Sequence, residues 1–199
     1  MKRSAVIALG VVGLVVFIII AMIAGTYNSL VSLNEGVSGQ WAQVENTYQR
    51  RADLVPNLVA TVRGAATHER ETLESVTEAR AKVGRLDAGD AFEDPAALER
   101  YQAAQDELST ALSRLLVVAE AYPQLRASEN FLALQSQLEG TENRIAVERK
   151  RFNDAARAFN TKRQSFPTVV IANMFGDRFE TKTYFEAEVG AAEAPKVEF

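Results

Sequence analysis

Twenty consecutive residues near the N-terminus carry no side chain that is charged or polar. The run Ala5–Ala24 reads AVIALGVVGLVVFIIIAMIA, and no charged residue occurs between Arg3 and Glu35. An α-helix rises about 1.5 Å per residue, so a helix of this length spans the roughly 30 Å hydrocarbon core of a bilayer. After Asn34 the sequence becomes charged, and no second apolar run of comparable length follows. The sequence therefore predicts a single membrane-spanning helix that carries a water-soluble body.

The residues flanking this run bear on its cleavage and its orientation. A cleaved secretory signal is the alternative, because Lys2 and Arg3 form a short basic region before the run. However, the run exceeds the usual length of about 7–15 apolar residues, and no well-formed cleavage site follows it. The first basic residue after the run is Arg50, so the excess of positive charge lies at the N-terminal side. We therefore expect the N-terminus in the cytoplasm and the body outside it.

Apolar residues recur at intervals of seven in two parts of the body, as is typical of helices that pack lengthwise on one another. The longer series begins at Phe131 and continues without a break to Phe166. We use the name core seam for the residues that this spacing predicts to be buried. They are Trp41, Tyr48, Phe131, Leu138, Ile145, Phe152, Phe159 and Phe166.

Helix-breaking residues divide the body into four long helices. Residues 84–93 carry two glycines and two aspartates, and Pro95, Pro123 and Pro167 mark further boundaries. We expect helices near residues 26–63, 65–84, 95–120 and 128–165, arranged as an up-and-down antiparallel bundle. The predicted fold is all-α and has five parts. They are a basic N-terminus at 1–4, a transmembrane helix at 5–25, a helical bundle at 26–166, a short helix and extended segment at 167–188, and a disordered tail at 189–199.

Several short strings occur in a fixed order along the chain. They are Asn28-Ser-Leu-Val, Arg50-Arg-Ala-Asp53-Leu-Val-Pro-Asn57-Leu-Val, Tyr122-Pro-Gln-Leu-Arg126, Glu142-Asn-Arg-Ile-Ala146, Arg151-Phe-Asn-Asp154, Phe159-Asn160, Phe166-Pro167 and Tyr184-Phe-Glu-Ala187. In this order they resemble the LemA family of bacterial membrane proteins. The resemblance implies an N-terminal transmembrane helix and a soluble all-α bundle, and it implies no catalytic residues. With the flanking charges, it predicts a single-pass protein of the bacterial cytoplasmic (inner) membrane.

Polar residues on the first and last predicted helices form a candidate structural or partner-docking site. Arg51, Asp53 and Asn57 surround Pro56, which removes one backbone hydrogen bond and either kinks or ends its helix. Asn57 is expected to form a buried polar network that fixes the register of the bundle. Its partners would be three asparagines of the last helix, Asn143, Asn153 and Asn160. Docking of a partner protein at these residues is the alternative.

No pattern in the sequence points to an enzyme, a metal or a cofactor. His68 is the only histidine, and Ala65 stands where a Glu-x-x-His metal pair would need its glutamate. The chain has no cysteine, no Gly-x-Ser-x-Gly turn and no glycine-rich phosphate loop. The net charge of −4 gives no electrostatic footprint for nucleic acid. We therefore expect neither catalysis nor a nucleic-acid partner.

The expected function is that of a non-enzymatic scaffold or assembly factor at the cell envelope. Its expected partners are the lipid bilayer, further copies of itself and other envelope membrane proteins. Self-association is expected through Ala21-x-x-x-Gly25, a small-residue face of the transmembrane helix, and through an apolar stripe along residues 131–166. The alternative is an extracytoplasmic sensory or ligand-binding bundle that acts through another protein.

Overall fold

The computed structural model describes residues 2–66, 68–89 and 91–186, and it contains no β-strand within these ranges. The predicted all-α fold is therefore confirmed. The elements in chain order are α1 (Lys2–Ala65), α2 (Arg70–Val83), α3 (Pro95–Glu120), α4 (Pro123–Arg126), α5 (Glu129–Gln164), α6 (Thr168–Met174) and the 3-10 helix η1 (Gly176–Phe179). The tail at 189–199 that the sequence predicts to be disordered lies outside the described residues.

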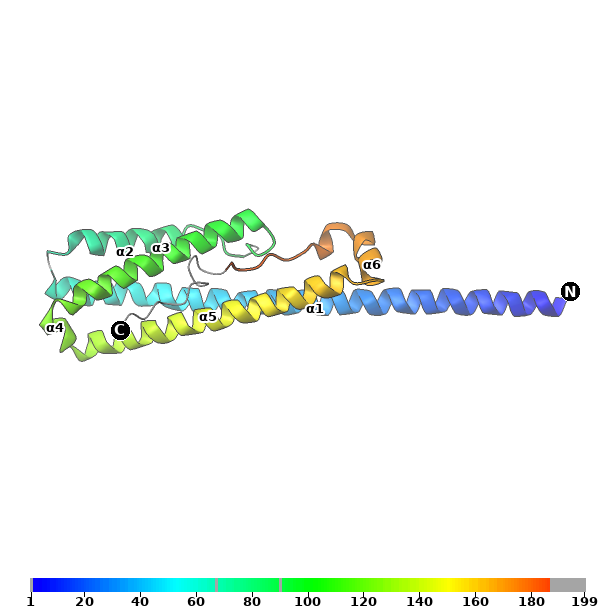
Figure 1. The fold of residues 1–199 in the computed structure, drawn as a ribbon, viewed down its shortest axis with the longest axis horizontal. Helices are drawn as coiled ribbons and strands as arrows, with labels where there is room; N and C mark the ends of the chain where they lie inside the picture. The colour runs from blue at the N-terminus through cyan, green and yellow to red at the C-terminus, as the bar shows by residue number, and fades with distance from the viewer. Residues whose placement is uncertain (1, 67, 90, 187–199) are drawn as a thin grey trace, which may run out of the picture.

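The longest element, α1, combines two parts that the sequence treats separately. Its 64 residues include both the apolar run and the first helix of the bundle, and they form one helix about 96 Å long. The N-terminal part projects beyond the bundle, and no residue of its most apolar window is buried (Figure 1). This part is long and apolar enough to cross a membrane. Pro56 lies inside α1, so it does not end the helix.

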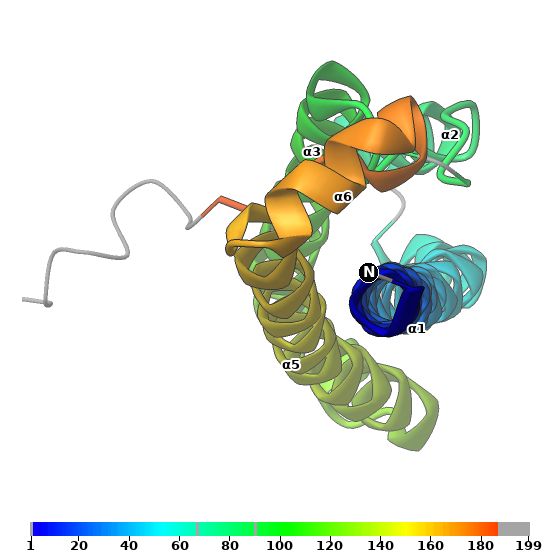
Figure 2. The same ribbon diagram turned by 90° about the vertical axis from the view of Figure 1, so that its right-hand side faces the viewer.

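The body is an up-and-down bundle of α1, α2, α3 and α5, as the sequence predicts (Figure 1). α5 packs along α1, and α3 packs along α2; Figure 2 shows these helices end on. The short α4 turns the chain at the end far from the apolar run (Figure 1). α6 lies across the opposite end, where α1 leaves the bundle (Figure 1). Residues 180–186 then return along the bundle without regular secondary structure.

Local capping sets the starts of two long helices. The Asp94 carboxylate accepts a hydrogen bond from the main-chain N–H of Ala96 at 2.9 Å, and Pro95 occupies the first turn of α3. The Ser128 hydroxyl accepts one from the main-chain N–H of Phe131 at 3.4 Å at the start of α5. α2 begins at Arg70, later than the predicted residue 65.

The buried apolar residues form two clusters. The proximal cluster, on the side of the apolar run, includes the aromatic side chains of Trp41, Tyr48, Phe92, Tyr101, Phe152, Phe159, Phe179 and Phe185. The distal cluster is mainly aliphatic and includes Val55, Leu58, Val62, Leu73, Val76, Leu108, Leu112, Leu115, Phe131 and Leu138. Both clusters use α1, α3 and α5, but only the proximal cluster uses residues that follow α5.

Seven of the eight core-seam residues are buried, and Phe166 is the exception. The Phe166 side chain is 84% exposed, so its predicted burial is wrong. The physical reason is that α5 ends at Gln164 and the chain leaves the helical path before the next seam position. The other seam residues of α5 are covered within the chain, which removes the apolar stripe from which self-association of the body was predicted.

Candidate functional site

Arg51 lies at the junction of the two clusters and is 1% exposed. Its Nη1 donates hydrogen bonds to Ser109 Oγ at 2.5 Å and to Glu142 Oε1 at 2.8 Å. Its Nη2 donates to the main-chain oxygen of Gln105 at 3.2 Å and to the Oε1 of the same residue. Because these partners belong to α3 and α5, one guanidinium joins α1 to both helices. A planar group with several donors suits this position better than a lysine ammonium.

The buried Arg51 cluster therefore takes the register-fixing role that the sequence assigned to asparagines. A one-residue slip of α3 or α5 would separate the guanidinium from its acceptors and leave a buried cation without partners, which is costly. The signal in the sequence is that Arg51 lies between Tyr48 and Val55 on the buried side of α1. A lone charged residue on an apolar helix face indicates a buried partner.

Pro56 is accommodated by a contact from α2. A proline at this position cannot donate to the main-chain oxygen of Ala52, four residues earlier. The Nε of Arg80 donates to that oxygen at 2.9 Å instead. The carbonyl that Pro56 frees thus becomes an attachment point between α1 and α2. This explains how a proline is tolerated within a 64-residue helix.

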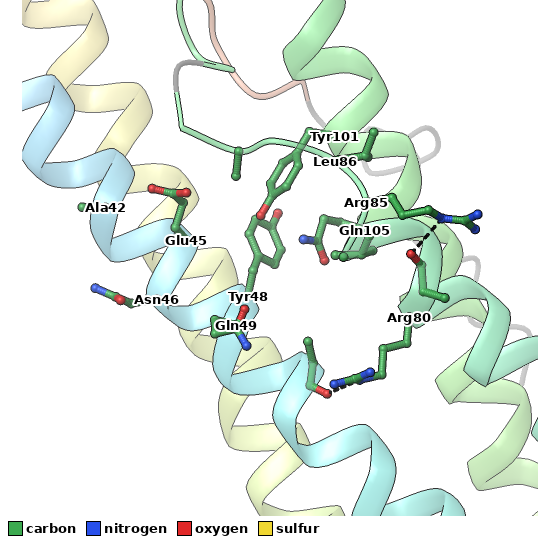
Figure 3. Close-up of a pocket in the computed structure, with 15 residues that line it drawn as sticks. Ala42, Glu45, Asn46, Tyr48, Gln49, Arg80, Arg85, Leu86, Tyr101 and Gln105 are labelled. Carbon is green, nitrogen blue, oxygen red and sulfur yellow. Dashed lines mark hydrogen bonds between the residues drawn. The ribbon is translucent and has the colours of Figure 1, made fainter.

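A groove of about 610 Å³ opens between α1 and the α2–α3 connection (Figure 3). Tyr48, Gln49 and Glu45 line it from α1, and Tyr101 and Gln105 line it from α3. The Tyr48 hydroxyl and the Gln105 Nε2 are buried and have no hydrogen-bond partner among the described residues. Both residues also line a smaller cavity of about 70 Å³ beside Arg51. The groove is thus backed by polar atoms that a small polar ligand or water can satisfy.

The two tyrosines of the groove are neutral over a wide pH range. Burial raises the pKa of Tyr48 to about 12, although Arg149 and Arg51 oppose the shift. Burial likewise raises the pKa of Tyr101 to about 12. Their rings meet edge to face with centroids 5.6 Å apart. Neither phenol has a lowered pKa, so neither is activated as a base or nucleophile.

Asn153 and Asn160 of α5 bind the main chain of the returning segment. Asn160 donates to the main-chain oxygen of Lys182 and accepts from its N–H, both at 2.8 Å. Asn153 accepts from the Phe185 N–H at 2.9 Å and donates to its oxygen at 3.0 Å. Seven helical residues rise about 10.5 Å, and three extended residues span about 10 Å, so the two pairs share one register. In the sequence, the seven-residue spacing of Asn153 and Asn160 is the feature that indicates a shared partner on one face of α5.

The other predicted polar residues do not meet. Asn57 and Asn143 are exposed, so the buried network of four asparagines does not form and that prediction is wrong. Asp53 is also exposed, and its carboxylate accepts a hydrogen bond from Gln49 Nε2 at 2.8 Å. These three side chains leave the helices on the solvent side and are free to contact water or a partner.

Within the described ranges no three His, Cys, Asp or Glu residues are grouped so as to hold a metal ion. His68 lies exposed in the turn between α1 and α2. The polar groups of the site are the Arg51 guanidinium with its partners Ser109, Gln105 and Glu142, together with the phenols of Tyr48 and Tyr101 and the Glu45 carboxylate that line the groove. Such groups can bind and orient a small polar molecule, and neither tyrosine has a pKa lowered toward that of a base or nucleophile.

These features define a class: an all-α bundle that continues directly from an apolar N-terminal helix. The sequence model of the LemA family matches residues 40–199. The chain belongs to the LemA family, as the resemblance in the sequence predicts. Taken with the apolar helix, the membership identifies it as a membrane-associated helical protein.

Similar proteins include magnetosome proteins. Magnetosome protein MamQ 1 of Paramagnetospirillum magneticum is 26% identical over 96% of this chain and 75% of its own length. Magnetosome protein MamQ of Magnetospirillum gryphiswaldense is 27% identical over 95% of this chain and 74% of its own length. Protein LemA of Metamycoplasma hominis is 24% identical over 74% of this chain and 64% of its own length. None of these names states a reaction.

Proposed function

We propose that this protein is a membrane-anchored scaffold or assembly factor of the bacterial cell envelope and that it acts without catalysis. The observation that carries the proposal is the continuity of α1, which contains both the apolar run and one side of the bundle. A helix without a break allows no bend between its two parts, so the body stands at a fixed height above the bilayer and tilts only with the membrane-spanning part. Fixed presentation of a rigid surface is what a scaffold needs.

The names of the relatives support this proposal by analogy. The MamQ proteins are named for a cellular structure, the magnetosome, and not for a reaction. The groups of the Arg51 cluster and the groove also favour binding over chemistry, since both phenols keep a raised pKa. The partners we propose are envelope membrane proteins and a second copy of the chain. The second copy would contact Ala21 and Gly25, because the seam of α5 is already covered.

The test compares two insertions after Gly25 in the full-length, tagged protein. One insertion is a flexible Gly-Ser segment, and its control is a helix-forming alanine-rich segment of about seven residues, or two helical turns. Each protein is cross-linked in cells, purified in mild detergent and analysed for co-purifying proteins. A scaffold keeps a stoichiometric partner with the helical insertion and loses it with the flexible one. Recovery of the unmodified protein alone would argue against the proposal.

The proposed location is the cytoplasmic membrane, with the N-terminus inside and the body outside. This follows from the basic residues before the apolar run and their absence directly after it. A reporter that is active only outside the cytoplasm should be active when fused after Phe199. Activity of a cytoplasmic reporter alone at that position would reverse the orientation.

A second candidate function, ligand binding by a sensory bundle, is favoured by the groove. Its supporting observation is that the buried Tyr48 hydroxyl and Gln105 Nε2 lack partners among the described residues. A ligand that satisfies them should raise the melting temperature of the full-length protein in a saturable way, and Tyr48→Phe should weaken the effect. The absence of saturable stabilisation across a panel of small polar molecules would leave the scaffold as the better account.

A further inference from the structure

An apolar patch lies at the end of the body where α1 leaves the bundle. We call Phe166, Val170, Met174 and Phe175 the α6 patch. Their side chains are 84%, 54%, 68% and 41% exposed, respectively. Val170 and Met174 are four residues apart and therefore share one face of α6. Phe166 and Phe175 flank the same helix, and large exposed apolar side chains on and beside one short helix mark an interaction surface.

The α6 patch is held in place from its other side. Thr168, Ile171 and Ala172 of α6 are buried against the bundle. Arg163 of α5 donates to the main-chain oxygen of Phe179 at 2.5 Å and to Asn173 Oδ1 at 3.3 Å. The exposed face of α6 is therefore part of a packed structure.

The turn after α6 fixes this segment to α1. Gly176 adopts φ +58°, a left-handed conformation that glycine reaches without strain. This turn brings Phe179 back to Tyr27 of α1, with ring centroids 5.6 Å apart, while Phe175 lies 4.8 Å from the same ring. Both sides of the turn thus pack on one residue of α1.

The contact with α1 sets the level of the α6 patch relative to the apolar run. Phe175 lines a hollow of about 310 Å³ together with Ile20, Ile23, Ala24, Tyr27 and Asn28. Ile20, Ile23 and Ala24 belong to the last turns of the apolar run. When that run occupies the bilayer core, Phe175 lies at the edge of the same core, because α1 is continuous.

We propose that α6 is a second membrane contact, in which the α6 patch inserts into the interface of the leaflet from which the body emerges. The occupant is lipid, at the boundary between acyl chains and headgroups, where amphipathic segments lie about 5–10 Å deep. Tyr27 sits just beyond the apolar run, and the guanidinium of Arg178 lies 5.5 Å from its ring centroid. An aromatic ring beside a cation is the pairing expected at headgroup level. The proposal depends only on α1 crossing a membrane and goes beyond the scaffold function.

A second contact changes what the anchor does. A single helix leaves the body free to rotate about the helix axis and to tilt with it. An inserted α6 beside α1 restricts both movements, so one side of the bundle always faces the bilayer. Orientation of the body then comes from residues far apart in the sequence, Tyr27 and the segment 166–179.

The experiment uses the absence of cysteine from the chain, which allows labelling at one site. Met174→Cys carries a fluorophore on the α6 patch, and Val117→Cys on α3 is a matched control, since both native side chains are 68% exposed. Each full-length protein is reconstituted in phosphatidylcholine vesicles that contain phosphatidylcholine with a nitroxide near the headgroup. Iodide in the buffer serves as the water-borne quencher.

The proposal predicts that the lipid nitroxide quenches the label at position 174 several-fold more strongly than the label at position 117. Iodide should quench the label at position 117 more strongly than the label at position 174. Equal access of iodide to both labels would overturn it, because the α6 patch would then face water. Protection of position 174 from both quenchers would also overturn it, because protein and not lipid would cover the patch. Phe166→Cys, at the most exposed member of the patch, should repeat the result if the label at 174 disturbs packing.

Discussion

The two ends of the bundle are stabilised differently. The distal cluster is built mainly from aliphatic side chains of α1 to α5, and Val62, Leu112 and Leu115 are among its most deeply buried members. The proximal cluster is built around Trp41. The centroid of its ring lies 5.4 Å from the ring centroid of Phe152 and 5.7 Å from that of Phe185. Its indole N–H donates to the Ala88 main-chain oxygen at 2.8 Å, so the α2–α3 connection is part of the same core.

The difference shows which end needs the C-terminal segment. Four helices can cover one another's aliphatic faces at the distal end. At the proximal end the larger aromatic side chains require Phe179 and Phe185 to complete the core, and the Asn153 and Asn160 pairs hold that segment in register. Lys182 adds an ion pair to Glu93 at 2.7 Å. The core at the end next to the apolar run is thus completed by residues that follow α5 in the sequence.

The largest expected effect follows from ending the chain after Pro167. The truncation removes Phe179 and Phe185, and loss of a buried phenylalanine typically costs about 3–5 kcal/mol. We expect the proximal cluster to lose its fixed packing while the distal helices stay folded. Trp41, the only tryptophan, reports this directly as a red shift of its emission when the protein that lacks residues 168–199 is compared with the full-length protein. Unchanged emission would show that the segment is not part of the core.

Single truncations of core side chains compare the two clusters directly. Phe152→Ala in the proximal cluster should lower the free energy of unfolding by about 3–5 kcal/mol, and Leu115→Ala in the distal cluster by about 2–5 kcal/mol. Phe166→Ala is the control and should have little effect, because its side chain is exposed. Denaturant unfolding in detergent measures the stability of all three variants. Only Phe152→Ala should also change the emission of Trp41, because Phe152 packs against the Trp41 ring. An unchanged stability of Phe152→Ala would place the seam outside the core.

The architecture was predictable from the sequence, whereas the contacts of its polar residues were only partly so. Seven-residue spacing identifies the buried faces of α1 and α5, because burial on a long helix is a one-dimensional property. The partners of Arg51 lie 54 to 91 residues away in the chain, and spacing within one helix carries no information about them. Asn153 and Asn160 were identified as polar residues of interest, but their partner is an irregular segment without a periodic pattern.

The Arg51 cluster lies between the proximal and distal clusters. Substitutions of its two charged partners, Arg51 and Glu142, should lower the free energy of unfolding by unequal amounts. Glu142→Ala strands a buried cation and should cost about 3 kcal/mol, the low end for a broken buried pair, because the Glu142 side chain is 38% exposed. Arg51→Met removes the charge, so we expect about 1–2 kcal/mol from the unmatched acceptors of α3. Chemical denaturation of the full-length variants measures both. A larger loss for Arg51→Met would mean that Glu142 does not neutralise the guanidinium.

Alkaline pH should weaken the proximal cluster gradually. Tyr48 and Tyr101 have folded-state pKa values of about 12, against about 10 in an unfolded chain. Only the unfolded state loses these protons between about pH 10 and pH 12, so stability is intact below this window and is lost within it. Each tyrosine should contribute a loss of about 1.4 kcal/mol per pH unit. Tyr48→Phe should remove about half of that slope, and an unchanged slope would show that the phenol is hydrated.

The central claim is that the membrane-spanning helix and the body form one rigid unit. Hydrogen exchange of the full-length protein in lipid nanodiscs tests it at residues 25–36, where α1 passes from the apolar run into the bundle. The continuous helix predicts slow exchange across this segment, comparable to residues 37–48, whose side chains pack in the proximal cluster. Rapid exchange at residues 25–36 between two protected flanks would show a flexible linker and would contradict the account.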